Sequence, residues 1–142
     1  MSKDPSVSFI IPVYNEEYNI PNVLKGLYQV LEVHPEWNWE VIVIEDGSRD
    51  RTRAVILEEI RKYSGIQLIL HDKNQGYTPS LKEGIARARG KFLMYIGADE
   101  EFDCSEVPSF VSPLLEGQTD VVLGVRWQRN AYKLSRFFLY VI

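Results

Sequence analysis

The sequence of 142 residues predicts an α/β fold of three layers, in which helices cover both faces of a mainly parallel sheet. Short apolar runs rich in β-branched residues alternate with amphipathic helical patterns along the chain. Such alternation gives parallel strands joined by right-handed crossovers. The run from Val41 to Ile44 is apolar at every position, which is typical of a strand buried on both faces.

Five runs are expected to form strands, because each is short, apolar and rich in β-branched residues. The expected strands are Val7–Val13, Glu40–Ile44, Ile66–Leu70, Phe92–Ile96 and Asp120–Leu123.

Four helical patterns lie between these strands, each with one apolar face. The second is expected to follow the cap Asp50 and the third to begin at Thr78-Pro79. The fourth begins at Ser105 and should kink or break at Pro113. The inward-facing residues are Ile20, Val23, Leu24, Leu27 and Leu31 in the first helix, Ile56, Ile60 and Tyr63 in the second, Leu81, Ile85 and Ala88 in the third, and Val107, Phe110, Val111, Leu114 and Leu115 in the fourth.

The composition is that of a globular protein in a reducing compartment. Hydrophobic residues make up 45% of the chain and charged residues 25%, which argues against disorder. No apolar run approaches the roughly 18 residues needed to cross a bilayer. The single cysteine, Cys104, excludes an internal disulfide. Neither His34 nor His71 has neighbours at the spacing of zinc ligands.

The charges are distributed unevenly along the chain. All 20 acidic residues precede residue 126, whereas residues 126–142 contain four basic residues and no acidic one. An apolar stripe that includes Phe137 and Phe138 lies opposite Lys133 in this segment, as in a helix at a membrane interface. The same stripe could instead pack on the body of the domain, and the sequence leaves both interpretations open.

The acidic residues with the least ordinary placement follow the expected strands. Glu45 and Asp46 follow the second expected strand, and Asp99 and Glu101 follow the fourth. Ligands of open parallel sheets bind beyond the carboxyl ends of the strands. Such an acidic edge favours a shared Mg²⁺ or Mn²⁺, which suits a diphosphate ligand. Helix capping is the simpler explanation for Asp50, and the same holds for Ser105 in its own helix.

Three segments in this order resemble the family-2 glycosyltransferases of the GT-A fold, and among them the polyprenyl-phosphate (dolichol-phosphate mannose synthase-like) branch. The similarity extends from about Val7 to Arg136. The segments read VSFIIPVYNEEYNI, VIVIEDGSRDRT and NQGYTPSLKEGIARARGKF.

The resemblance implies donor-binding roles for residues that follow the first four strands. They are Pro12, Tyr14 and Glu16 in the nucleoside pocket, Ile44 and Asp46 at the base and ribose, Lys73 toward the phosphates, Gly76 and Gly84 beneath the nucleotide, and Ala98 in the fourth loop.

The resemblance also implies a metal site and a catalytic set. Asp99 matches the last acid of the Asp-x-Asp motif and would bind Mg²⁺ or Mn²⁺ with Glu101, while Arg126 and Arg136 would face the sugar or the acceptor phosphate. The chain departs from the family pattern at two acids: Glu45 stands at the first acid of the family's Asp-Asp-x-Ser motif, and Gly97 at the first acid of Asp-x-Asp. Because glycine offers no carboxylate, a weakened metal site is expected.

The resemblance implies an inverting transfer of a sugar from a UDP-sugar, or else a GDP-sugar, to polyprenyl phosphate. A phosphate acceptor is already anionic and needs arginines more than a general base. Residues 1–125 would form the catalytic domain that binds the nucleotide sugar. Residues 126–142 would form a basic amphipathic tail, the start of a truncated acceptor region, that meets the cytoplasmic face of a membrane. No nucleic-acid partner is expected.

Two alternatives remain from the sequence: a saccharide hydroxyl as acceptor, and a catalytically weakened module that binds nucleotide without turnover. A phosphate-accepting signalling domain is disfavoured because its acid pair would follow the first strand. A dinucleotide-binding fold is disfavoured because the chain has no G-x-G-x-x-G sequence.

Overall fold

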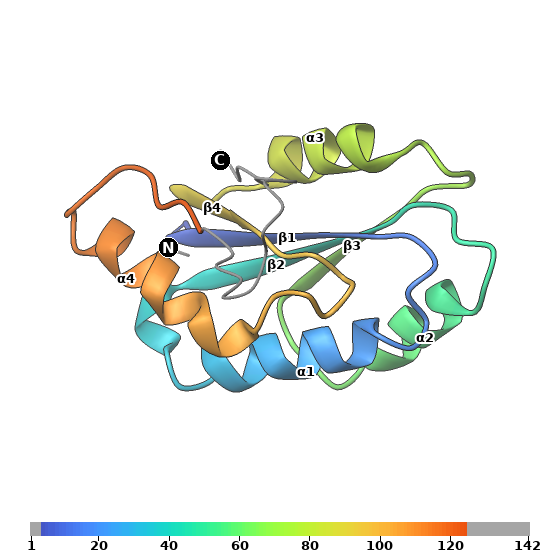
Figure 1. Cartoon of the computed structure of the whole chain (residues 1–142), viewed down its shortest axis with the longest axis horizontal. Coiled ribbons are helices and arrows are strands. Elements are labelled where there is room, and N and C mark those ends of the chain that lie inside the picture. Colours follow the sequence, from blue (N-terminus) through green and yellow to red (C-terminus); the bar gives the residue numbers. More distant parts are fainter. Residues whose placement is uncertain (1–3, 125–142) are drawn as a thin grey trace, which may run out of the picture.

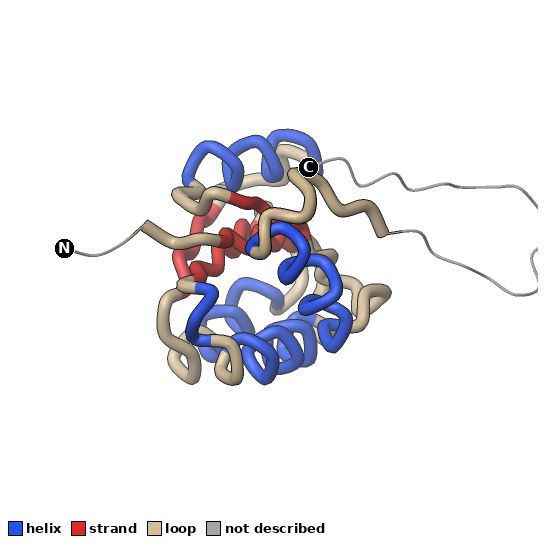
Figure 2. Tube along the Cα trace, turned by 90° about the vertical axis from the view of Figure 1, so that its left-hand side faces the viewer, coloured by secondary structure: helices blue, strands red, loops and turns tan. Residues whose placement is uncertain are grey.

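The computed structural model describes residues 4–124 as a parallel sheet between two layers of helices. All strand pairs are parallel, and the strands are ordered β3-β2-β1-β4. Figure 1 shows α3 above the sheet and α1, α2 and α4 below it, and the turned view in Figure 2 shows the strands between these layers. The elements are β1 (Val7–Val13), α1 (Ile20–Leu31), η1 (Pro35–Trp37), β2 (Trp39–Glu45), α2 (Thr52–Glu59), β3 (Ile66–Leu70), α3 (Tyr77–Arg87), β4 (Phe92–Tyr95), η2 (Cys104–Glu106) and α4 (Val107–Leu115).

The two faces of the sheet form separate cores, because successive side chains of a strand point to opposite sides. Phe9 and Ile11 of β1 belong to the larger core, between the sheet and the layer of α1, α2 and α4. Ile10 lies between them in sequence and belongs to the smaller core beneath α3, together with Ile42 and Ile44. The expected three-layer α/β/α fold is therefore confirmed.

Helix α3 lies unusually close to the sheet at Gly84. A Cβ atom there would be 2.5 Å from Ile10 Cγ2 and 2.9 Å from Ile44 Cδ1. The face that meets the sheet is built from the small residues Ser80 and Gly84, both buried. The predicted inward position of Ile85 is therefore wrong, since Ile85 is turned outward and exposed.

Most expected elements lie where the sequence placed them. β1 and β3 have the predicted bounds, and β2 extends one residue further in each direction. The fourth helical segment differs, because a turn of 3-10 helix over residues 104–106 precedes α4. There the cap is the side chain of Asp103, which accepts a hydrogen bond from the Ser105 amide. The expected break at Pro113 is absent, because α4 continues through it and ends two residues later.

The expected fifth strand, Asp120–Leu123, does not form. Residues 121–124 have no regular secondary structure, and the side chains of Val121 and Leu123 are almost half exposed. A strand requires a neighbour to accept and donate its backbone hydrogen bonds. Within residues 4–124 the sheet ends at β4, and residues 120–123 do not pair with its free edge.

Two further expectations concern the membrane. None of the helices in residues 4–124 is both long and apolar enough for a bilayer span. The predicted amphipathic tail, residues 126–142, lies outside the described residues.

Candidate functional site

The loops that follow the strands meet at one edge of the sheet, because parallel strands end on the same side. In Figure 1 the loops after β1, β2 and β3 project to the right, away from the amino ends of these strands. This edge is where the sequence placed a ligand.

The first two loops are hydrogen-bonded to each other. The amide of Asn15, a residue with a φ of 54°, donates to Ser48 Oγ at 3.0 Å. The Asn15 side chain accepts in return from the Arg49 amide at 2.8 Å. One residue further, the Glu16 amide donates to Thr52 Oγ1 at 2.8 Å. The loop after β1 is therefore held by the loop that leads into α2.

The second and third loops pack backbone against backbone at Gly47. This residue has a φ of +65°, and a Cβ atom on it would lie 2.3 Å from the Lys73 carbonyl carbon and 2.5 Å from the Asn74 nitrogen. Only glycine fits both the conformation and the contact. The glycine of the segment Glu45-Asp46-Gly47-Ser48 is thus explained by the approach of the third loop.

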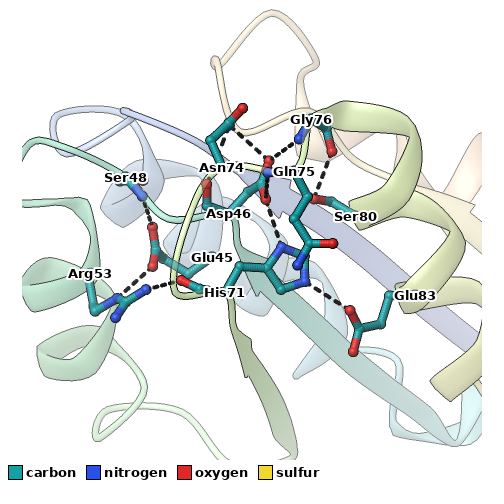
Figure 3. Close-up of polar contacts among 10 residues, drawn as sticks. All are labelled: Glu45, Asp46, Ser48, Arg53, His71, Asn74, Gln75, Gly76, Ser80 and Glu83. Atoms are coloured by element: carbon teal, nitrogen blue, oxygen red, sulfur yellow. Dashed lines mark hydrogen bonds and ion pairs between the residues drawn. The ribbon is translucent and has the colours of Figure 1, made fainter.

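Asp46 organises the third loop from within (Figure 3). Its side chain is only 3% exposed and accepts hydrogen bonds from four groups on residues 71–76. Burial on its own would raise the pKa of Asp46, but the hydrogen bonds outweigh it and lower the pKa overall. The donors are His71 Nδ1 at 2.6 Å, Asn74 Nδ2 at 2.9 Å and the amides of Gln75 and Gly76, each at 2.9 Å.

His71 connects Asp46 to α3. Its imidazole is 4% exposed, and its Nε2 lies 2.8 Å from Glu83 Oε2. Burial alone would lower the pKa of His71, but the hydrogen bonds and charges of Asp46 and Glu83 together raise it. Figure 3 shows the imidazole between the two carboxylates.

Glu45 has a structural role of its own and points away from Asp46 in Figure 3. Its carboxylate is fully buried, accepts from the Ser48 amide at 2.6 Å and pairs with Arg53 Nε at 2.6 Å. Arg53 also donates to the carbonyl oxygen of His71. The acid that departs from the family pattern therefore anchors α2 and the start of the third loop.

The loop after β4 presents Asp99 and Glu101 at the surface. The Asp99 Oδ1 atom accepts from the Glu101 amide at 3.1 Å. A Cβ atom on Gly97 would lie 2.9 Å from the same oxygen, so an acid at position 97 would stand beside Asp99. Within residues 4–124 no three His, Cys, Asp or Glu side chains converge in a way that could hold a metal ion. The protein groups described therefore do not by themselves complete the expected site.

Two tyrosines, which the sequence interpretation did not single out, lie beside this loop. The rings of Tyr77 and Tyr95 meet edge to face with their centroids 5.5 Å apart. Tyr77 is half exposed, and the Tyr95 hydroxyl would be 3.5 Å from a Cβ on Gly97. They add an aromatic surface next to Asp99.

The predicted site residues differ in how accessible they are. Tyr14, Lys73, Asp99 and Glu101 are exposed at the edge, and Pro12, Glu16 and Gly76 are partly buried there. Ile44 and Ala98 are buried, and Ile44 packs beneath α3, which leaves its side chain no surface for a base. Arg126 and Arg136 lie outside the described residues.

The sequence interpretation missed His71 and Glu83. It tested the two histidines only for nearby metal ligands, whereas the partners of His71 are 25 residues before it and 12 residues after it. A histidine directly after an expected strand, at the edge where ligands bind, was the available signal.

The model of the family described as "Glycosyl transferase family 2" matches residues 8–138. The chain belongs to this family. Among curated relatives, it is 38% identical to a dolichyl-phosphate beta-glucosyltransferase of Trichomonas vaginalis, a match that covers 94% of this chain. It is 30% identical to the dodecaprenyl-phosphate galacturonate synthase of Rhizobium johnstonii over 87% of its length. The expected similarity to the polyprenyl-phosphate branch is confirmed.

Solved structures of glycosyltransferases share this family-2 fold. S. aureus TarS in complex with UDP-GlcNAc superposes with a TM-score of 0.68 at 24% identity, over 81% of this chain and 32% of that one. A Pyrobaculum calidifontis mannosyltransferase in complex with GDP-Man and Mn²⁺ gives a TM-score of 0.61 at 24% identity, over 68% and 28%. These matches confirm the GT-A fold.

The family-2 chain spans only part of its relatives. It covers 43% of the length of the Trichomonas glucosyltransferase and 36% of the Rhizobium synthase.

Proposed function

We propose that this chain is the donor-binding part of an inverting glycosyltransferase that moves a sugar from a nucleoside diphosphate to polyprenyl phosphate. The observation that carries the proposal is the similarity, over 94% and 87% of the chain, to two relatives named for sugar transfer involving a polyprenyl phosphate. A UDP-sugar is the first candidate donor and a GDP-sugar the second.

The strand-end edge supports the donor part of the proposal. Four loops meet there, three of them joined by hydrogen bonds or close backbone packing around Asp46 and Gly47. Rigid loops reduce the entropy lost when a flexible nucleotide binds. Exposed groups on this frame, including Tyr14 and Lys73, can meet the nucleoside and the phosphates.

The acceptor chemistry follows from its charge. A phosphate oxygen that is already ionised attacks the anomeric carbon as the bond to the nucleoside diphosphate breaks on the opposite face, which inverts the configuration. No proton has to leave the acceptor, so positive groups that orient two anions matter most. Arg126 and Arg136 are proposed for this role. The basic segment 126–142 is proposed to hold the reaction at the cytoplasmic face of a membrane.

A divalent ion is proposed to assist by offsetting charge on the leaving diphosphate. Asp99 would be its main protein ligand and Glu101 a second one, with the remaining ligands supplied by the donor phosphates and water. Since Gly97 adds no oxygen, we expect a weak dependence on Mn²⁺ or Mg²⁺.

A transfer assay tests the proposal. The chain is incubated with UDP-glucose or GDP-mannose, Mn²⁺ and a short polyprenyl phosphate in detergent, and the lipid product is identified by mass spectrometry and its anomeric configuration by NMR. A polyprenyl-phosphate sugar of inverted configuration supports the proposal. Retention of configuration, or failure of both donors to bind, contradicts it.

Gly97 favours a second candidate, a module that binds nucleotide without turnover. Binding of the donor by calorimetry with no lipid product, even after long incubation, would support this candidate over an enzyme.

A further inference from the structure

His71 lies in a setting that demands two protons on its ring. Nδ1 is 2.6 Å from Asp46 Oδ1, and Nε2 is 2.8 Å from Glu83 Oε2. An ionised carboxylate only accepts hydrogen bonds, and a neutral imidazole has a single N–H to donate. Both short contacts are hydrogen bonds only when the ring is an imidazolium. Although burial opposes protonation, the hydrogen bonds and negative charges of Asp46 and Glu83 raise the pKa of His71.

The charged groups that surround His71 lie on β2 and its following loop, on α2 and on α3. Asp46 comes from the end of β2 and Glu83 from α3, while Arg87 pairs with Glu83 from the solvent side at 3.4 Å. On the main chain of His71, Arg53 of α2 donates to the carbonyl oxygen, and the amide donates to the Glu45 carbonyl at 2.9 Å. Arg53 and Arg87 already pair with Glu45 and Glu83, so the imidazolium is the cation that faces Asp46 directly.

Asp46 connects this ring to the third loop. The carboxylate that His71 holds also accepts from the amides of Gln75 and Gly76. Gly76 has a φ of 96° and is the residue from which α3 starts. Glu83 is on the same helix, so His71 joins the loop's Asp46 anchor to the body of α3. The loop carries Lys73 and Gly76, which are proposed donor-binding residues.

We propose that His71 is a positioning residue whose imidazolium holds the loop of residues 72–76 in its donor-binding shape, so that affinity for a nucleotide sugar falls when this ring loses its proton. The inference rests on the proposed function, because it concerns regulation of the same donor site. His71 does not touch the donor and acts through Asp46.

The direction of the pH dependence follows from the geometry of the His71 contacts. A group whose pKa is raised by folding stabilises the fold fully below its ordinary pKa, and this stabilisation is lost as the pH rises through the raised value. On deprotonation one ring nitrogen turns from a donor into an acceptor and faces a carboxylate, so one of the two contacts becomes repulsive. Glu83 is partly exposed and can turn to solvent. The ring then loses its contact with α3, and its remaining hydrogen bond to Asp46 is weaker because the donor is no longer charged.

NMR of the imidazoles measures the pH at which His71 loses its proton. The chain has two histidines, and His34→Gln leaves the signal of His71 alone. We expect the ring of His71 to titrate above the ordinary histidine range, and the amide signals of Gln75 and Gly76 to shift with the same midpoint. Glu83→Gln keeps an acceptor for Nε2 but removes its charge, so it should lower that midpoint. Glu58→Gln, an exposed change on α2 with the same charge difference, should leave it unchanged.

Calorimetry measures whether the affinity for the donor follows the titration of His71. UDP-glucose and GDP-mannose are titrated at fixed Mn²⁺ from about pH 6 to pH 9, a range in which histidine changes charge and the esterified diphosphate does not. We expect affinity to weaken on the order of tenfold across the titration of His71, the equivalent of one buried charged hydrogen bond. In Glu83→Gln the weakening should begin at lower pH, and in Glu58→Gln it should follow the wild type.

A His71 ring that titrates in the ordinary range overturns the inference, as does donor affinity that stays constant through its titration. Constant affinity with measurable binding leaves the proposed function intact. Absence of binding at every pH contradicts both. A loss of affinity in Glu83→Gln that is equal at every pH would assign Glu83 a structural role only and also overturn the inference.

Discussion

At the scale of single residues, the neighbouring acids Glu45 and Asp46 have different partners and different consequences. Glu45 turns toward α2 and pairs with Arg53, whereas Asp46 turns toward the third loop. The sequence placed both directly after a strand; in the structure Glu45 is the last residue of β2 and Asp46 follows it. It could not predict that Asp46 is buried, because the groups that cover it come from residues 71–76, about 25 to 30 positions later.

Asp46→Asn tests this organising role. An asparagine keeps the size of the side chain, but its NH₂ group must face one of the N–H donors that now point at a carboxylate. We expect a loss of about 2 kcal/mol in the free energy of unfolding, the typical cost of a buried donor without an acceptor. UDP should also raise the melting temperature less than in the wild type. Chemical denaturation and thermal shift measure both effects, and an unchanged stability with full UDP response would contradict them.

Gly97→Asp tests the missing acid. Gly97 is not among the residues with a positive φ, so its backbone accepts a side chain. The near contact is Asp99 Oδ1, the end of a side chain that can move, and an acid here places two carboxylates side by side. We expect UDP binding to tighten with Mn²⁺ in this variant, and Asp99→Asn to remove metal dependence. Calorimetric titration of UDP into the wild type and both variants, with and without Mn²⁺, measures these effects. If the variant folds but binds no more tightly, while the wild type needs metal strongly, other ligands complete the site.

At the scale of elements, hydrophobic periodicity and turn residues were sufficient for the four described strands and for the larger helices. Periodicity predicted the wrong face for Ile85, because the distance between α3 and the sheet is set by Ser80 and Gly84 rather than by large apolar residues. It also predicted a strand at Asp120–Leu123, where the residues are suited to a strand but do not pair with β4, the edge strand of the described sheet.

Gly84→Ala measures how closely α3 packs on the sheet. An added methyl would overlap Ile10 and Ile44, and overpacking of this kind typically costs about 1–3 kcal/mol. This cost opposes a gain of about 1 kcal/mol from helix propensity. The matched control is Gly26→Ala in α1, where the nearest atom would be Cys104 Cβ at an ordinary 3.4 Å. We expect the first change to destabilise and the second to stabilise the chain in urea denaturation. Stabilisation by both would show that α3 can move away from the sheet.

At the scale of the whole molecule, the site is an assembly of loops that only the fold brings together. The motifs identified the acids and glycines of the site. The parallel topology explains why these residues lie at the same edge of the sheet. The network through His71 could not be inferred from motifs, since Asp46 follows β2, His71 follows β3 and Glu83 lies on α3, and only the fold brings the three side chains together. Arg126 and Arg136, which are proposed to bind the acceptor, lie outside the described residues.

The basic segment 126–142 yields a prediction for the intact chain. Each basic residue near an anionic surface contributes about 1 kcal/mol, which salt weakens. The chain should therefore sediment with vesicles that contain phosphatidylserine at low salt and be released as salt is raised. Replacing its four basic residues by glutamine should abolish the effect, whereas vesicles of neutral lipid serve as the control. An intact chain that stays in the supernatant at low salt would favour packing of the segment on the domain.

Nucleotide sugars are proposed to bind where the carboxyl ends of the strands meet. Amide NMR of the labelled chain during titration with UDP-glucose and GDP-mannose tests it most directly. We expect the amide signals that shift on donor binding to belong to residues 12–17, 45–50, 72–78 and 97–101. Amides at the opposite edge, in residues 38–40 and 88–91, should stay in place. Shifts centred on that opposite edge, or no saturable shifts with either donor, would contradict the account.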